Sequence, residues 1–237
     1  MERLLDELVA RLTKTFGERL ISVVLYGSAA AGDHHERFSD LNVFCVLAQV
    51  TPAELKESEP VFRWWREKGN PAPLLMSRAE VAASTDCFPI EFHDMQERRR
   101  VLHGQDVVGA LQIDDAFYRA HVEHELRAKL IRLRQKAAGA LFDHQLLLRL
   151  MAESLSTFLV LGRHALRLAG APAPWLKREI VPQLGSRFEV PVEPLLVLLE
   201  LREGRRSPKK IDPVPLLRSY LDALGALVDA VDRLERS

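Results

Sequence analysis

The fold is most constrained by two short apolar runs that a polar loop separates. Residues 21–26 are apolar and rich in β-branched side chains, and they end at Gly27-Ser28. A second apolar run spans residues 41–48. Short apolar runs of this length, bounded by turn residues, are typical of buried strands. The sequence therefore predicts a sheet with a tight turn at the end of its first strand.

The residues at the ends of these strands have the chemistry that a triphosphate site needs. Gly27 permits backbone N–H groups to approach phosphate oxygens, and the hydroxyl of Ser28 can bond a terminal phosphate oxygen. Asp40 and Asn42 lie two residues apart at the start of the second run. Side chains alternate along a strand. Asp40 and Asn42 are therefore expected to share one face, while Leu41 and Val43 face the core.

These residues resemble the motif of the nucleotidyltransferase superfamily, which includes DNA polymerase beta and kanamycin nucleotidyltransferase. Its mark is a Gly-Ser turn, then about a dozen residues, then two carboxylates on a strand. Gly27-Ser28 matches the turn and Asp40 matches the first carboxylate, but Asn42 stands where the second belongs. The resemblance implies a third carboxylate on a later strand, and Glu91 is placed to supply it.

The activity that the resemblance implies is transfer of a nucleoside monophosphate from a nucleoside triphosphate to an acceptor hydroxyl. Gly27 and Ser28 would hold the phosphates, and Asp40, Asn42 and Glu91 would hold Mg²⁺ or Mn²⁺. The acceptor is open between a small molecule, a protein and RNA.

Asn42 weakens this metal site, because its carbonyl oxygen carries no charge. Loss of a unit charge at metal distance removes ~4 kcal/mol of attraction at an effective dielectric of about 20. Three hypotheses follow: an active transferase in which Asp40 and Glu91 suffice, a nucleotide-binding pseudoenzyme, and a protein-interaction module that no longer binds nucleotide.

The amino-acid composition changes near residue 112, where long Leu-rich segments almost free of Pro and Gly begin. We therefore predict an α/β domain over residues 1–112, with a mixed sheet and flanking helices, and an all-α helical bundle over residues 113–237. Helices are expected at residues 4–16, 52–68 with a break at Pro60, 78–83, 116–140, 144–169, 194–202 and 215–234. Strands are expected at residues 21–26, 41–48, 73–76, 89–94 and 101–102.

The helix predicted at residues 116–140 carries several basic side chains. The first interpretation is a solvated face. The second is a clamp that binds the triphosphate: Arg127 and Arg134, which share one side at helical spacing, could act together, and Lys129 is the other candidate. In the predicted strand at residues 89–94, His93 shares a face with Glu91. The bundle also offers carboxylates that could serve as a general base: Glu123, Glu125 and Glu153.

The overall charge argues against a protein that coats nucleic acid. Lys plus Arg and Asp plus Glu both total 33, so the formal net charge is zero. The N-terminus lacks the pattern of a signal peptide, and no apolar run approaches the ~20 residues that span a bilayer. We expect a cytoplasmic protein with no membrane partner; a homodimer is left open.

Overall fold

The computed structural model describes residues 1–31 and 41–234 and leaves out the side chains of Ser28 and Ala31. The chain divides into two compact units, Met1–Asp115 and Ala116–Ser237. The boundary predicted near residue 112 falls in the connection between the last strand of the first unit and the first helix of the second.

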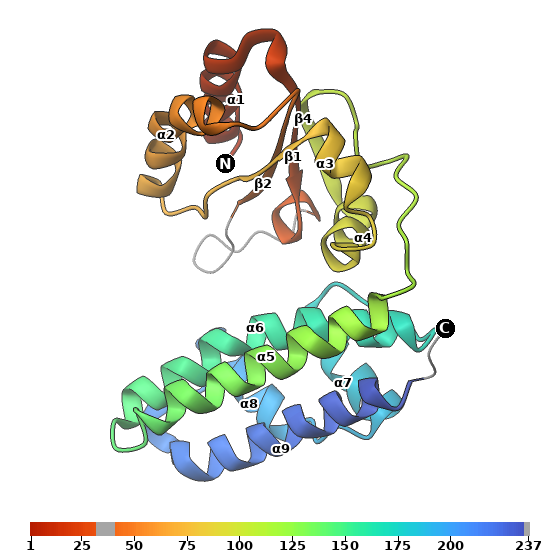
Figure 1. The fold of residues 1–237 in the computed structure, drawn as a ribbon. Helices are drawn as coiled ribbons and strands as arrows, with labels where there is room; N and C mark the ends of the chain where they lie inside the picture. The colour runs from red at the N-terminus through yellow and green to blue at the C-terminus, as the bar shows by residue number, and fades with distance from the viewer. Residues whose placement is uncertain (32–40, 235–237) are drawn as a thin grey trace. The chain divides into compact units, whose positions relative to one another are not determined.

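The first unit is built on a four-stranded mixed sheet with strand order β3-β2-β1-β4 (Figure 1). The central strand β1 is antiparallel to both β2 and β4, whereas β2 and β3 are parallel. The strands are Leu20–Tyr26 (β1), Asn42–Leu47 (β2), Leu74–Ser77 (β3) and Arg99–Gly104 (β4). The predicted mixed sheet is confirmed, including its last strand.

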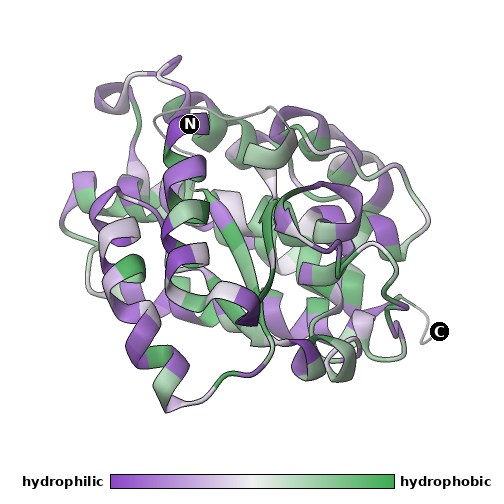
Figure 2. Cartoon of the chain, turned by 90° about the horizontal axis from the view of Figure 1, so that it is seen from above, coloured by the Kyte–Doolittle hydropathy of each residue, from purple (hydrophilic) through white to green (hydrophobic). Residues whose placement is uncertain are grey.

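Helices cover both faces of this sheet. Val43 and Cys45 of β2 belong to the core beneath α1 and α2, while Phe44 and Val46 belong to the core beneath α3 and α4. The helices are Glu2–Phe16 (α1), Pro52–Glu67 (α2), Arg78–Ala83 (α3) and Pro89–Glu97 (α4), with short 3₁₀ turns at Gly17–Arg19 (η1) and Ser28–Ala31 (η2). The central strands are mostly hydrophobic in colour, and the helices carry hydrophilic and hydrophobic sides (Figure 2). Leu41 and Val43 face a core, as expected. The opposite face of β2, which carries Asn42, is also covered, because Phe44 and Val46 on that face belong to a second core.

The predicted strand at residues 89–94 is wrong, because this segment forms helix α4. Pro89 occupies the first turn, where its fixed φ suits a helix and its missing N–H costs nothing. Phe92 and Met95 are buried three residues apart, which is helical spacing. A six-residue segment is too short for its apolar pattern to distinguish the helical period of about 3.6 residues from the strand period of about two.

Two prolines lie inside helices, although a break was expected at the first of them. Pro60 does not break α2, which runs unbroken from Pro52 to Glu67, and Pro182 lies within a helix that the sequence did not predict. Both prolines are exposed. The backbone carbonyl that each one leaves without a partner can therefore bond water, which lowers the cost of keeping the helix.

The second unit consists of helices. They are Tyr118–Ala138 (α5), His144–Leu168 (α6), Lys177–Phe188 (α7), Glu193–Arg202 (α8) and Pro213–Asp232 (α9), with a 3₁₀ turn at Pro208–Lys210 (η3). Helix α6 contacts each of the other four and supplies much of the core. By length and apolar composition it is the one described helix that could cross a membrane, a test that the core helix of a globular unit also passes. It buries Arg163 and His164 among its neighbours.

Candidate functional site

A left-handed glycine ends the central strand of the first unit. Gly27 follows β1 directly and has φ 78°, a conformation that residues with a side chain rarely adopt. The 3₁₀ turn η2 begins at the next residue, and the N–H of Ala30 donates to the Gly27 carbonyl at 3.1 Å. The chain thus turns sharply away from the sheet at the position where the sequence predicts a phosphate-binding turn.

Asn42 lies beside this turn. It is the first residue of β2 and pairs in register with Tyr26, the last residue of β1. Its side chain is half-buried, and its Nδ2 atom lies 3.5 Å from the point that a Cβ on Gly27 would occupy. The antiparallel register therefore brings together two predicted site residues that are 15 positions apart in the sequence.

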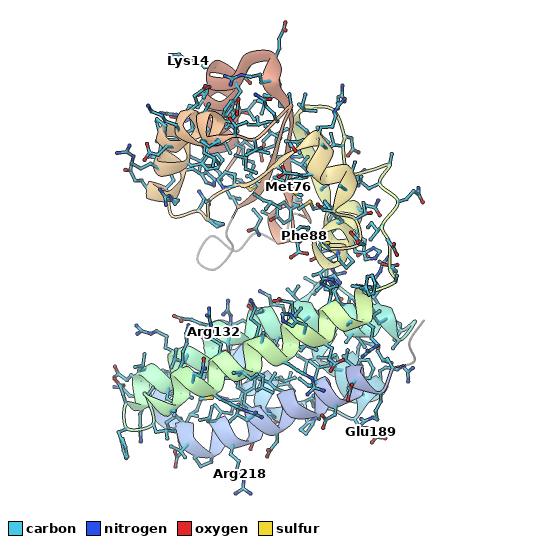
Figure 3. The ribbon with its side chains drawn as sticks, in the orientation of Figure 1. Lys14, Met76, Phe88, Arg132, Glu189 and Arg218 are labelled. Atoms are coloured by element: carbon cyan, nitrogen blue, oxygen red, sulfur yellow. The ribbon has the colours of Figure 1, made fainter. Side chains whose placement is uncertain are left out.

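Glu91 approaches the same end of the sheet from a helix. It lies in the first turn of α4, which begins after Phe88 (Figure 3), and its side chain is exposed. Burial raises the pKa of the Tyr26 hydroxyl, and the negative charge of Glu91 raises it further. Tyr26 packs against the core that contains Phe92, the residue after Glu91, so Glu91 lies on the side of the sheet that carries Tyr26. Gly27, Asn42 and Glu91 therefore gather around the end of β1.

The remaining parts of the predicted metal site lie outside what the structure describes. Asp40 is outside the described residues, and so is the side chain of Ser28. Within residues 1–31 and 41–234, no group of three His, Cys, Asp or Glu side chains could hold a metal ion. The donors present are the carboxamide oxygen of Asn42 and the carboxylate of Glu91, both hard oxygen ligands of the kind that Mg²⁺ accepts. They fit a cation whose positive charge is neutralised mainly by the phosphates of a nucleotide.

The basic residues predicted as a clamp on α5 have different surroundings within the helical unit. Arg127 donates to Glu123 at 2.7 Å and lies 3.5 Å from Asp232 of α9. Lys129 lines a pocket between α5 and α6, which contains neither Arg127 nor Arg134. Arg134 is exposed.

Other predicted participants have structural partners. His93 is buried, with Nε2 2.6 Å from Asp115 Oδ1, so it does not share an exposed face with Glu91. Glu123 forms ion pairs with both Arg119 and Arg127, and Glu125 pairs with Lys129. Glu153 lines the pocket between α5 and α6.

The helical unit contains buried cations that sequence reasoning missed. Arg163 is 2% exposed and stacks on Trp175 with its guanidinium carbon 3.7 Å from the ring centre. Burial, together with the charge of Arg167, lowers the pKa of Arg163 to about 10. His164 is fully buried, with Nδ1 2.5 Å from the Tyr118 hydroxyl. The signal in the sequence is an Arg-His pair inside an apolar stretch of α6.

A second cationic pair lies in the same unit. Burial lowers the pKa of Lys177, and the neighbouring charge of Arg202 lowers it further. Burial also lowers the pKa of Arg202, which donates to the Ala152 carbonyl at 2.6 Å. The negative charge of Glu153 acts on Arg202 in the opposite direction, so the pair is partly compensated within the unit.

Comparison with known proteins identifies the fold. The chain matches no protein family by sequence, and no curated protein is similar to it by sequence. Its structure is similar to that of a spectinomycin adenyltransferase, AAD(9), from Enterococcus faecialis, solved with ATP and spectinomycin. The TM-score is 0.65 at 13% sequence identity, over 98% of this chain and 100% of that one. The chain therefore has a nucleotidyltransferase-type fold, a mixed sheet with flanking helices followed by C-terminal helices.

Proposed function

We propose that the protein transfers a nucleoside monophosphate from a nucleoside triphosphate, with ATP as the first candidate, to a hydroxyl group of a small molecule. The observation that carries this proposal is the gathering of Gly27, Asn42 and Glu91 around the end of β1. The similarity in fold to an adenyltransferase solved with ATP supports it. Because fold alone does not fix function, the residues at the strand end carry the argument.

In the proposed reaction, the acceptor oxygen attacks the α-phosphorus. The bond from that phosphorus to the oxygen that bridges to the β-phosphate breaks, pyrophosphate leaves, and the proton of the hydroxyl passes to solvent. The N–H groups of the turn at Gly27 and Ser28 bind phosphate oxygens, and positioning of the two reactants supplies much of the rate enhancement. Mg²⁺ or Mn²⁺, when bound with the nucleotide by Asp40, Asn42 and Glu91, would neutralise phosphate charge.

A second candidate function is nucleotide binding without transfer. The neutral side chain of Asn42 favours it, since a site with one charge fewer holds a metal ion less tightly. In this case the protein would bind the nucleotide at the same turn and would use occupancy of the site as a signal.

The direct test is calorimetric titration of the full chain with ATP, GTP, CTP and UTP, each with and without Mg²⁺. We expect metal-dependent binding of at least one nucleotide, and loss of that binding in Asp40→Ala. Pyrophosphate release with spectinomycin as the first acceptor then separates a transferase from a protein that only binds. If none of the four nucleotides binds at millimolar concentration, both functions are excluded and the interaction module remains.

Gly27→Ala tests the turn. A side chain at φ 78° is strained by roughly 1–2 kcal/mol, so we expect this variant to lose stability and also to bind the nucleotide less tightly. Gly204→Ala is the matched control, because Gly204 has φ 70° and nothing within 4 Å of an added Cβ. Urea unfolding should show a similar loss of stability in both variants, whereas calorimetry should show weaker binding only for Gly27→Ala. Equal affinity in the two variants would remove the turn from the site.

A further inference from the structure

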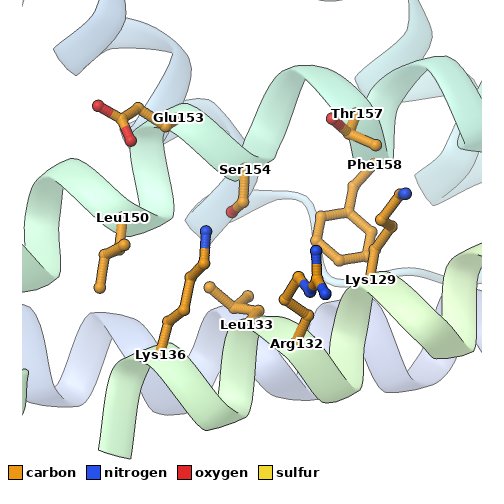
Figure 4. Close-up of a pocket in the computed structure, with 9 residues that line it drawn as sticks. All are labelled: Lys129, Arg132, Leu133, Lys136, Leu150, Glu153, Ser154, Thr157 and Phe158. Carbon is orange, nitrogen blue, oxygen red and sulfur yellow. The ribbon is translucent and has the colours of Figure 1, made fainter. Parts of the chain in front are cut away.

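A pocket of about 210 Å³ lies within the helical unit, between α5 and α6. Lys136 and Arg132 of α5 and Leu150 and Phe158 of α6 point into the space between the helices, whereas the Glu153 carboxylate points away from α5 (Figure 4). The lining residues are Lys129, Arg132, Leu133, Lys136, Leu150, Glu153, Ser154, Thr157 and Phe158. None of the residues at the end of β1 belongs to it.

The charge of this pocket is predominantly positive. Lys129, Arg132 and Lys136 recur at helical spacing, so all three lie on one side of α5. Lys129 pairs with a carboxylate of its own helix at 3.1 Å, but across the described residues Arg132 and Lys136 form no ion pair. Glu153 is the one acidic residue in the lining. With Lys129 paired, Arg132 and Lys136 still outnumber the one carboxylate, which favours an anionic ligand.

The floor of the pocket is apolar, and its α6 wall carries hydroxyls. Leu133 and Phe158 are 4% and 2% exposed, so the base of the pocket is continuous with the core. The Ser154 hydroxyl donates to the Met151 carbonyl at 2.8 Å and lies 3.1 Å from the Tyr220 hydroxyl, which fixes its position. A ligand in this pocket would meet the cations of α5 at its head and an apolar surface at its body.

We propose that this pocket binds a small phosphate monoester with an apolar body. Two cations without ion pairs among the described residues, Arg132 and Lys136, suit the double negative charge of the phosphate, and the floor at Leu133 and Phe158 suits an aromatic or aliphatic group. The volume is below the ~300–1,000 Å³ of sites for drug-sized ligands, so the ligand is no larger than a substituted single ring. The proposal is independent of nucleotidyl transfer at the end of β1.

The test is calorimetric titration of the full chain with phenyl phosphate, inorganic phosphate and benzyl alcohol. We expect phenyl phosphate to bind more tightly than either the phosphate head or the ring alone. The double variant Arg132→Gln/Lys136→Gln should bind it at least tenfold more weakly. The matched control Lys209→Gln/Arg218→Gln removes the same charge from exposed positions outside the pocket (Arg218 is labelled in Figure 3) and should bind normally.

A third variant separates occupancy of the pocket from general attraction of anions. Thr157→Phe keeps every charge but fills the space between the helices, and it should abolish binding while circular dichroism shows the fold intact. The proposal is overturned by any one of four results: no binding of phenyl phosphate at millimolar concentration, equal binding of inorganic phosphate, equal losses in the two double variants, or normal binding by folded Thr157→Phe. Asp40→Ala should leave phenyl phosphate binding unchanged, and its loss there would assign the anion to the nucleotide site instead.

Discussion

Asn42→Asp is expected to strengthen the binding of Mg²⁺-ATP by at least about tenfold. The added carboxylate would restore a unit charge beside the Gly27 turn, and such a charge contributes up to ~4 kcal/mol at metal distance in a moderately screened site. Asn42 is half-buried, so solvent screening reduces this value. The measurement is titration with ATP at saturating Mg²⁺, followed by pyrophosphate release with an acceptor.

The sign of the effect should reverse when the metal is removed. Without Mg²⁺ the new carboxylate faces the triphosphate directly, and repulsion should make ATP bind more weakly to Asn42→Asp than to the natural sequence. Gln145→Glu, which adds the same charge at an exposed position in the first turn of α6, should change neither affinity. An Asn42→Asp variant that binds ATP equally well with and without Mg²⁺ would show that position 42 does not contact the metal.

Phe44→Ala is expected to lower the free energy of unfolding of the first unit by about 3–5 kcal/mol, the cost of removing a fully buried aromatic side chain. Phe44 is 0% exposed and lies in the core beneath α3 and α4, two residues along β2 from Asn42. Urea unfolding followed by circular dichroism measures the loss. Because α4 packs on this core, the position of Glu91 should also be disturbed, and nucleotide affinity should fall with stability.

The chain supplies a matched control for this truncation. Phe142 lies in the turn between α5 and α6 and is 102% exposed, so Phe142→Ala removes the same atoms from water rather than from a core. We expect a change within about 0.5 kcal/mol. A loss at Phe142 comparable to that at Phe44 would mean that Phe142 is covered by a partner in solution.

The sequence predicted those elements whose apolar pattern is long or bounded by clear turn residues. β1 and β2 were found because each is a continuous apolar run that ends at turn residues, and α6 because its pattern extends over many turns. Helix α7 was missed because Pro182 reads as a break, although its exposure lets the helix continue. The rule that a proline ends a helix does not consider solvent, although access to water decides how much free energy the unpaired backbone carbonyl costs.

The candidate site was harder to predict than the fold because its neighbours are set by tertiary packing. The sequence grouped Asn42 with Gly27 through a motif, and the strand register explains their proximity. It placed Glu91 on the wrong kind of element, and the packing of α4 on the sheet brings that residue near Tyr26. Burial, the main cause of the lowered pKa of Arg163, depends on how α6 packs in the helical unit, and the local sequence offers only an Arg-His pair inside an apolar stretch.

The antiparallel pairing of β1 with β4 has a consequence for how the first unit folds. This pairing joins Leu25 to Arg100 and Ser22 to Gly104, so the central strand closes a loop that contains most of the unit. Contacts so distant in sequence form slowly, because the chain loses the entropy of loop closure before the contacts between the paired strands can stabilise it. A growing chain that emerges from the ribosome cannot complete this sheet until residue 104 is available. The turn at Gly27, although synthesised early, would become a rigid binding surface only when nearly the whole unit has been made.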